Sequence, residues 1–486
     1  MRRPASTLLL ALLMAAAIVP SATAAVAAPI PRERLSGLGD FVDGVMAQQL
    51  ASREVAGAVV TIVHDDRVIL SRGYGKADVA RGQAVDPETS LFRPGSVSKL
   101  FTWILLMQLV EQGRVGLDDD VNRYLDFTIP PFAGQPVRVR DLLTHSPGFN
   151  ETSGIITRDA AQLKPFREWM RANLPRRLWP AGTEIAYSNY GSALAGIIVE
   201  QVTGQPFEQA AEQRLFAPLG MRATTFAEPL PSALAPHLAT GYRLEQGRFV
   251  AQLPERISAI MPAGSATTSA PDMARFMRML LNEGRLDGRR VLAPASVRFL
   301  MADGMANAPD LPGMGHGFIV YRKAGPRLVG HGGNTADFRS LLLLAPEARL
   351  GVFISMTGGS ASRAARTELA DLLVGRLFPQ LPSPRLAAPD GEVVPIGTYR
   401  PNRRDHDRPS PPAALLTVAA AGSNAITVMQ EGQPSHWERV GPLLYERTTG
   451  AGPTGPFDRL QFRQTPDGWV LVIGSLSHML YRRIDP

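Results

Sequence analysis

Residues 92–112 read FRPGSVSKLFTWILLMQLVEQ, and this stretch decides the fold. The Pro94-Gly95 pair breaks the chain, and the residues that follow leave almost no polar face. A helix that is apolar all round is buried in the middle of a domain, so we predict a buried helix that begins at Ser96. Residues three apart share one face of a helix, which would place Lys99 one turn beyond the Ser96 hydroxyl.

The Ser-x-x-Lys motif at this helix start is suited to nucleophilic chemistry. A serine hydroxyl is a weak nucleophile until a neighbouring group takes its proton. Lys99 in an apolar helix loses hydration, which favours its neutral form and lowers its pKa. The N–H group of Ser96 lies where helical N–H groups are unpaired, and it can stabilise an oxyanion. Alone, the motif also fits a helix-capping serine and a lysine whose amine reaches solvent.

Tyr187-Ser188-Asn189 is the second candidate element, directly before a predicted helix over 191–202. The Tyr187 phenol can relay a proton if nearby cations make its phenolate accessible. Asn189 can orient a substrate amide or hold the lysine. In isolation, the same residues also fit a packed tyrosine with its hydroxyl bonded to a loop.

His331-Gly332-Gly333 is the third element, at the end of a strand predicted over 327–330. Glycine in a strand lets another backbone approach closely, so a substrate lying along this edge would pair with it. The N–H group of Asn334 would then be a second oxyanion donor. In isolation, a polar strand end with a glycine-rich turn is the alternative.

The remaining pattern predicts one antiparallel sheet built from both ends of a main domain that spans 35–380. An amphipathic helix near residues 38–50 precedes a hairpin, helices and long loops fill the middle, and strands return before a last helix at 364–377. We therefore expect an α+β fold in which sheet segments 55–92 and 315–380 flank a helical insert, 93–314. The predicted strands cover residues 58–63, 68–70, 317–321, 327–330, 338–344 and 350–355.

The C-terminal part has a different character. Residues 381–389 are rich in proline and alanine and read as a linker. Beyond them the chain is turn-rich and strand-like, which predicts a small all-β domain over 390–486. The six strands predicted there cover residues 415–419, 425–429, 443–447, 460–463, 469–473 and 479–481.

Composition excludes several classes of function. The net charge of +7 comes from arginines scattered among acids, with only four lysines, which indicates solvated faces and no nucleic-acid partner. The chain has no cysteine, which excludes disulfides, thiolate metal sites and a cysteine nucleophile. His64 and His145 fit structural positions, and neither H-E-x-x-H nor G-x-S-x-G occurs. We expect no metal, no cofactor and no obligate protein partner.

The N-terminus reads as a signal peptide over residues 1–24. Arg2 and Arg3 precede an apolar stretch, 8–19, and Ala22-Thr23-Ala24 offers a small-residue cleavage site. The apolar run is short for a bilayer span, although an N-terminal anchor is the alternative. We expect an exported protein, periplasmic or secreted, with no membrane span after cleavage.

Taken in order, the three motifs make the chain resemble the serine β-lactamase and penicillin-binding protein superfamily. The resemblance is to the branch with class C β-lactamases, D-Ala-D-Ala carboxypeptidases and related esterases, and it extends from about residue 38 to 377. It implies the DD-peptidase/β-lactamase-like fold, an antiparallel sheet flanked by helices with an inserted all-helical domain. Four stretches strengthen it: FRPGS at 92–96, LLTHSPG at 142–148, YSNYG at 187–191 and PLGM at 218–221.

The resemblance implies roles for the motif residues. Ser96 would be the acylated nucleophile, Lys99 and Tyr187 would share the base and acid roles, and Asn189 would position substrate. The segment from His331 through Gly332 and Gly333 replaces the Lys-Thr-Gly of the best-known penicillin-recognising enzymes. The C-terminal domain resembles lipocalin-like accessory domains of some members.

These implied roles predict a serine hydrolase that takes a small-molecule or peptide acyl substrate. His331 is charged only in part near neutral pH, whereas the lysine it replaces is always charged. This difference favours esterase or D-amino-acid peptidase activity. The alternatives are a β-lactamase and a catalytically inactive cell-wall or ligand-binding protein.

Overall fold

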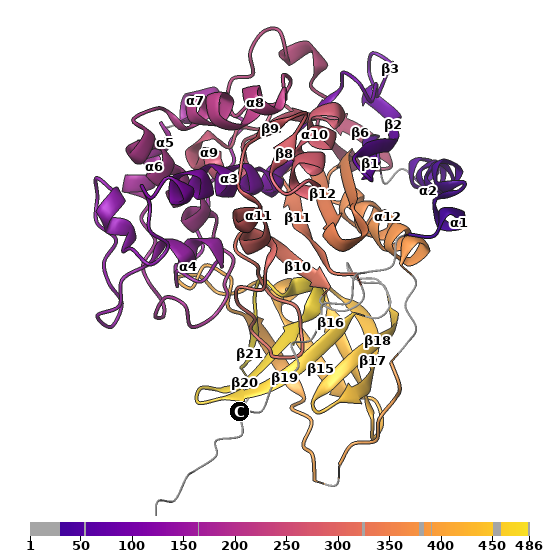
Figure 1. Ribbon diagram of the computed structural model, residues 1–486. Helices are drawn as coiled ribbons and strands as arrows, with labels where there is room; N and C mark the ends of the chain where they lie inside the picture. Colours follow the sequence, from indigo (N-terminus) through magenta and orange to yellow (C-terminus); the bar gives the residue numbers. More distant parts are fainter. Residues whose placement is uncertain are drawn as a thin grey trace, which may run out of the picture.

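The structure is a computed structural model in which two parts are distinct, a large mixed part above a smaller barrel (Figure 1). It describes residues 30–52, 55–163, 165–322, 326–378, 383–389, 391–450 and 458–484. The predicted signal peptide lies outside these residues. Within the described ranges, no helix has both the length and the apolar character needed to cross a bilayer.

A seven-stranded antiparallel sheet forms the centre of the large part, in the order β10-β11-β12-β13-β1-β2-β3. The two ends of the domain meet in the middle of this sheet, where β1 pairs with β13 from Gly57↔Thr357 to His64↔Leu350. The predicted sheet built from both ends is therefore confirmed. Its strands are β1 (Gly57–His64), β2 (Arg67–Asp78), β3 (Gln83–Ala84), β10 (Ile319–Arg322), β11 (Leu328–Asn334), β12 (Phe338–Ala345) and β13 (Leu350–Thr357).

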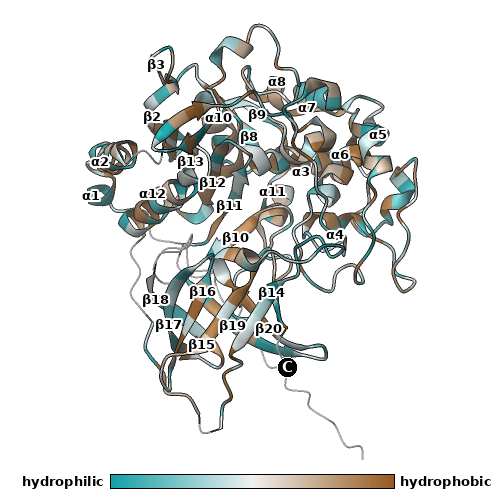
Figure 2. Ribbon diagram, turned by 180° about the vertical axis from the view of Figure 1, so that it is seen from behind, coloured by the Kyte–Doolittle hydropathy of each residue, from teal (hydrophilic) through white to brown (hydrophobic). Residues whose placement is uncertain are grey.

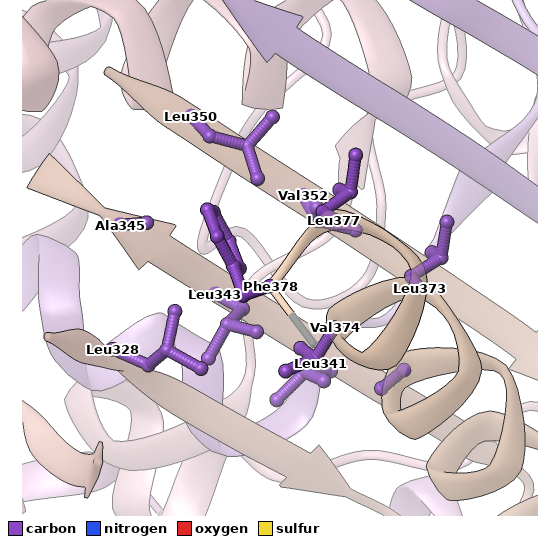
Figure 3. Close-up of a pocket in the computed structure, with 11 residues that line it drawn as sticks. Leu328, Leu341, Leu343, Ala345, Leu350, Val352, Leu373, Val374, Leu377 and Phe378 are labelled. Carbon is purple, nitrogen blue, oxygen red and sulfur yellow. The ribbon is translucent and has the colours of Figure 1, made fainter. Parts of the chain in front are cut away.

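Helices cover both faces of the sheet, which is why β12 and β13 are buried along their whole length. The short helix α1 (Arg32–Leu35), α2 (Leu38–Ala51) and α12 (Ala361–Leu377) lie together on one side (Figure 1). Side chains of α12, among them Leu373 and Leu377, point at Leu343 and Val352 of the sheet (Figure 3). The gap between them is only about 10 Å³ and fully apolar, too small for a ligand.

The helical region lies on the other side, around α3 (Ser98–Glu111). The helix begins two residues later than predicted, because Gly95–Val97 form a 3-10 turn, η1, that holds Ser96. The large apolar side chains of α3 are almost all inaccessible to solvent, as the sequence predicted. The other helices are α4 (Val139–Leu143), α5 (Phe166–Ala172), α6 (Asn189–Thr203), α7 (Phe207–Ala211), α8 (Ala217–Leu219), α9 (Met261–Gly264), α10 (Ala270–Leu281) and α11 (Pro294–Met301).

This region is not purely helical, because it also contains short two-stranded pairs. One of these pairs joins a strand late in the region to the strand just before η1, and so helps to fix the turn that holds Ser96. The pairs are β4 (Leu91–Phe92) with β7 (Thr268–Ser269), β5 (Tyr242–Glu245) with β6 (Arg248–Ala251), and β8 (Arg285–Leu286) with β9 (Arg289–Arg290).

The C-terminal part is a closed barrel of eight antiparallel strands, which confirms the predicted all-β character. Aromatic and aliphatic side chains, including Trp437, Tyr399 and Phe462, fill its interior, and hydrophobic stretches are visible along its strands (Figure 2). The barrel interior is thus a packed core. Its strands are β14 (Gly397–Pro401), β15 (Leu416–Ala420), β16 (Ala425–Gln430), β17 (Gln433–Gly441), β18 (Leu444–Gly450), β19 (Arg459–Thr465), β20 (Gly468–Ile473) and β21 (Tyr481–Arg483).

The barrel docks on the large part through an apolar patch and hydrogen bonds. Leu311, in the loop before β10, packs with Val472 and Leu480 of the barrel. The Gln461 side chain donates a hydrogen bond to Asp310 at 2.6 Å. This contact places the barrel below β10 and α4 (Figure 1), next to the segment that carries Tyr187.

Candidate active site

Ser96 and Lys99 meet at the junction of η1 and α3. The Lys99 Nζ lies 3.1 Å from the Ser96 Oγ. Lys99 is fully buried, whereas Ser96 is partly exposed. The Ser98 hydroxyl donates a 2.6 Å hydrogen bond to the Gly95 carbonyl and so closes the turn. Gly95 has φ 55°, a left-handed conformation that glycine adopts without strain.

Three oxygen atoms surround the Lys99 amine. Besides Ser96, Nζ contacts the Asn189 Oδ1 at 2.8 Å and the Ala263 carbonyl oxygen at 2.6 Å. Burial, with the positive charge of Arg403, holds the pKa of Lys99 well below its ordinary value, and Glu151 opposes this shift. A neutral amine has two N–H groups and one lone pair. Asn189 and Ala263 accept hydrogen bonds from the two N–H groups, which leaves the lone pair to face the Ser96 hydroxyl.

Two helices position these acceptors. Asn189 is the first residue of α6, and the Ser188 hydroxyl caps that helix by accepting the Gly191 N–H at 3.0 Å. Ala263 belongs to α9, which presses against α6. A β-carbon at Gly196 would lie 2.1 Å from a ring carbon of Pro262, so only glycine allows this approach.

Tyr187 lies beside the same amine. Its ring centroid is 4.9 Å from the Lys99 Nζ, and its hydroxyl is buried without a hydrogen-bond partner of normal geometry among the described residues. Burial raises the pKa of Tyr187 above its ordinary value, while the nearby Ser96 hydroxyl and Arg403 oppose the rise. The phenol is therefore protonated near neutral pH and able to donate a proton.

His145 supports the Tyr187 ring from below. The two rings stack with centroids 4.2 Å apart and an angle of 22° between their planes. The His145 Nδ1 accepts the N–H of Ser188 at 3.2 Å, so this nitrogen is unprotonated. Burial is the main cause that holds the pKa of His145 well below 6.5, and the charge of Lys99 is the second cause. These contacts make His145 part of the site, whereas the sequence indicated a purely structural position.

His331, on β11, is the other histidine beside Tyr187, with ring centroids 5.8 Å apart. It is 1% exposed, and its Nδ1 lies 2.6 Å from the Gly332 carbonyl oxygen. Burial, reinforced by Lys99, lowers the pKa of His331 to about 3. The partial charge expected from the sequence is therefore wrong, because this burial leaves the imidazole neutral at physiological pH.

Strand β11 also brings a backbone N–H group to Ser96. The Thr335 N–H bonds to the Phe338 carbonyl at 3.0 Å and closes the hairpin to β12. Hydrogen bonds alternate along an antiparallel pair, so the Asn334 N–H points away from β12. It faces η1, where a β-carbon on Gly95 would lie 3.1 Å from the Asn334 nitrogen. The Asn334 backbone thus lies beside the turn that carries Ser96, and the pairing of the two N–H groups as oxyanion donors stays a prediction.

Arg366, from α12, fixes this end of β11. Its Nη1 donates to the Gly333 carbonyl at 3.2 Å, to the Asn334 Oδ1 at 3.2 Å and to the Ser340 carbonyl at 2.8 Å. These bonds tie β11, β12 and α12 together at the site. Arg366 belongs to no motif that the sequence analysis singled out.

The barrel supplies two more residues that the sequence analysis missed. The Arg403 guanidinium carbon lies 4.5 Å from the Tyr187 ring centroid, and its Nε donates to Glu151 at 2.8 Å. The carbonyl of His478 accepts the Tyr187 N–H at 3.0 Å, and the two rings meet edge to face at 5.6 Å. More than 200 residues separate Tyr187 from either partner, so no local pattern signals the contact.

Further bonds tie the segment before Tyr187 to the barrel. The Asn402 Nδ2 donates to the Glu184 Oε1 and to the Ile185 carbonyl, both at 3.0 Å. Arg482 forms an ion pair with the same Glu184. Among the described residues, no group of three or more histidine, aspartate or glutamate side chains is arranged to hold a metal ion.

Sequence comparisons identify the family. A family model described as Beta-lactamase matches residues 42–375. Penicillin-binding protein 4 of Amycolatopsis lactamdurans is 34% identical over 343 residues, which cover 66% of this chain and 87% of that protein. Protein flp of Staphylococcus aureus (strain MW2) is 27% identical over 318 residues, or 64% of this chain, and the match spans 62% of that relative's length.

Solved structures extend the likeness to the whole fold. The octameric penicillin-binding protein homologue from Pyrococcus abyssi superposes with a TM-score of 0.62 at 21% identity. The match covers 92% of this chain and 100% of that chain, so it includes the barrel. The resemblance read from the three motifs is thus confirmed, and the chain belongs to the beta-lactamase family, within the superfamily of serine β-lactamases and penicillin-binding proteins.

Proposed function

We propose that this protein is a serine hydrolase that forms an acyl-enzyme on Ser96 with ester or D-amino-acid peptide substrates. One observation carries the proposal. The Lys99 Nζ lies 3.1 Å from the Ser96 Oγ, while Asn189 and Ala263 accept hydrogen bonds from the same amine. A buried neutral amine held in this way is a general base for the serine hydroxyl.

Acylation then follows in balanced steps. The Ser96 Oγ attacks the substrate carbonyl, and its proton passes to Lys99. The oxyanion accepts hydrogen bonds from the N–H groups of Ser96 and Asn334. As the bond to the leaving group breaks, Tyr187 donates its proton to that group and is reprotonated by the Lys99 ammonium.

Deacylation reverses the proton movements. A water molecule takes the place of the leaving group and gives a proton to the base formed by Tyr187 and Lys99 as it attacks the acyl carbon. The bond between the acyl carbon and the Ser96 Oγ then breaks, and the base returns the proton to Oγ, which leaves the product acid and the free Ser96 hydroxyl.

The strand that would recognise substrate favours neutral esters and peptides over β-lactams. Where the penicillin-recognising enzymes carry a lysine on this strand, this chain carries His331, whose pKa burial lowers to about 3. A neutral imidazole offers a hydrogen bond but no positive charge for the carboxylate of a β-lactam.

Intact mass spectrometry tests the proposal. The protein is exposed briefly to a fluorophosphonate, an activated short-chain ester and penicillin, with Ser96→Ala beside it. We expect a covalent mass increase in the wild type and none in Ser96→Ala, with the ester adduct lost faster than the penicillin adduct. Rapid loss of the penicillin adduct would instead indicate a β-lactamase. Absence of every adduct would indicate a binding protein.

We also propose that the protein is exported, on the strength of the signal-peptide pattern over residues 1–24. Expression of the full chain in a bacterial host, followed by mass analysis of the periplasmic fraction, tests this. The expected mature protein lacks residues 1–24. Full-length protein confined to the cytoplasm would contradict the proposal.

A further inference from the structure

The barrel reaches the site through the segment that follows β14. Arg403 lies in this segment, and its side chain is 27% exposed and paired with Glu151, which is 20% exposed. Neighbouring contacts fix the segment on both sides. Asn402 bonds to Glu184, and the His406 N–H bonds to the Asn150 Oδ1 at 2.9 Å. Arg403 is thus held by the interface.

The Tyr187 ring is enclosed by groups from both parts of the molecule. His145 stacks on it, and the Lys99 Nζ lies 4.9 Å from its centroid. The barrel supplies the Arg403 guanidinium at 4.5 Å and the His478 carbonyl and ring. A cation this close to an aromatic ring is attracted to it, which favours the ring position seen here.

We propose that the barrel is part of the catalytic centre, in which Arg403 positions the Tyr187 ring beside Ser96 and supplies a permanent positive charge, with Glu151 as its counter-charge. This inference rests on the proposed function and deepens it. Arg403 acts through other groups and is therefore a positioning residue.

The charge matters because the other groups that face Lys99 carry none at neutral pH. Burial is the main cause that keeps the imidazoles of His145, His331 and His478 neutral, and Arg403 lowers the pKa of each further. Tyr187 is protonated. Asn189 and Ala263, the remaining partners of Lys99, are neutral groups. Arg403 and its partner Glu151 are therefore the charged groups that act on Lys99.

Arg403 and Glu151 act on Lys99 with opposite signs. Burial lowers the pKa of Lys99 most. The charge of Arg403 lowers this pKa further, and the charge of Glu151 raises it. Lys99 must be neutral to accept the Ser96 proton, so the reaction rate rises with pH through the pKa of Lys99. Removal of the Arg403 charge therefore moves this acid limb to higher pH, and removal of the Glu151 charge moves it to lower pH.

The experiment measures the rate at which a fluorophosphonate labels Ser96, followed by intact mass between pH 4.5 and 10. The variants are Arg403→Met, Arg403→Lys and Glu151→Gln in the full chain. Arg176→Met is the matched control, because it breaks another ion pair of the same interface, with Asp407 at 2.8 Å. Thermal unfolding midpoints identify any variant that has lost its fold.

We expect the acid limb of Arg403→Met to shift upward by about 1 pH unit, the size that one nearby charge produces. Arg403→Lys keeps the charge and should stay near the wild type, Glu151→Gln should shift downward, and Arg176→Met should not move. This inference alone would be overturned if the wild type is labelled but the acid limb of Arg403→Met does not shift. Equal shifts of the acid limb in all variants would overturn it as well. Failure of the wild type to be labelled would overturn the proposed function with it.

Discussion

A β-carbon on Gly333 would lie 1.9 Å from the carbonyl oxygen of Pro94 and 3.2 Å from the backbone nitrogen of Ser96. Strand β11 and the turn that carries the nucleophile are therefore in direct backbone contact. The neighbouring Gly332 differs, because the nearest atom to its added β-carbon is the Tyr321 hydroxyl oxygen at 3.7 Å. Of these two positions, only position 333 requires glycine, because a β-carbon there would clash with the backbone before Ser96.

Gly333→Ala should therefore damage the site. The added methyl group must push β11 away from η1, which separates the two oxyanion donors. We expect acylation of Ser96 by an activated ester to slow roughly 100-fold or more, the cost of losing one oxyanion donor. Gly332→Ala is the matched control and should retain most of the wild-type rate. Equal rates for both variants would contradict the close contact.

Lys99→Met should abolish the base. Methionine keeps the length and apolar stem of the side chain but leaves nothing to take the Ser96 proton. We expect the acylation rate to fall about 10²- to 10⁴-fold, the usual worth of a general base. Lys76→Met is the control, since this exposed lysine only donates to the Gly82 carbonyl. An unchanged rate in Lys99→Met would show that another group takes the proton.

Carboxylate substrates provide a test of His331. If its imidazolium anchored them, affinity would be present below its pKa and lost as pH rises through it. Because burial lowers the pKa of His331 to about 3, the ring is already neutral at pH 5. We expect the KM of a carboxylate-bearing ester to show no step attributable to His331 between pH 5 and 8. His331→Gln should therefore have the same KM profile; a step near pH 6–7 in the wild type alone would refute this.

Stability should depend on a buried ion pair just before the nucleophile. Arg93 pairs with Glu228, and their side chains are only 6% and 1% exposed. Arg93→Met leaves the buried carboxylate without its cation, which should lower the free energy of unfolding by about 3–5 kcal/mol.

Urea unfolding measures this loss. Arg298→Met, which breaks an exposed pair with Glu283, is the control and should cost less than about 1 kcal/mol. Comparable losses in the two variants would mean that the buried pair is not specially stabilising.

Elements with a strong periodic signal could be predicted from the sequence. The core of α3 and the sheet built from both ends followed from apolar runs and turn residues, since burial dictates both. Two barrel strands did not. β14 contains Gly397 and Pro401, which usually interrupt strands, and β17 is largely polar, so tertiary pairing within the closed barrel decides both.

The candidate site divides in the same way. Ser96 and Lys99 are three residues apart, so helix geometry alone brings them together. Arg403 and His478 reach Tyr187 only because the barrel docks beside it, and that depends on contacts spread over the whole interface. The neutral state of His331 likewise depends on how completely its neighbours exclude water, which the sequence does not record.

The docking of the barrel also gives the chain an order of maturation. Ser96, Lys99 and Tyr187 emerge from the ribosome well before Arg403 and His478, which come from the last fifth of the sequence. An unfinished or truncated chain would carry the nucleophile without the groups that surround its tyrosine. The arrangement around Tyr187 is therefore assembled only after the barrel strands have been synthesised and have closed.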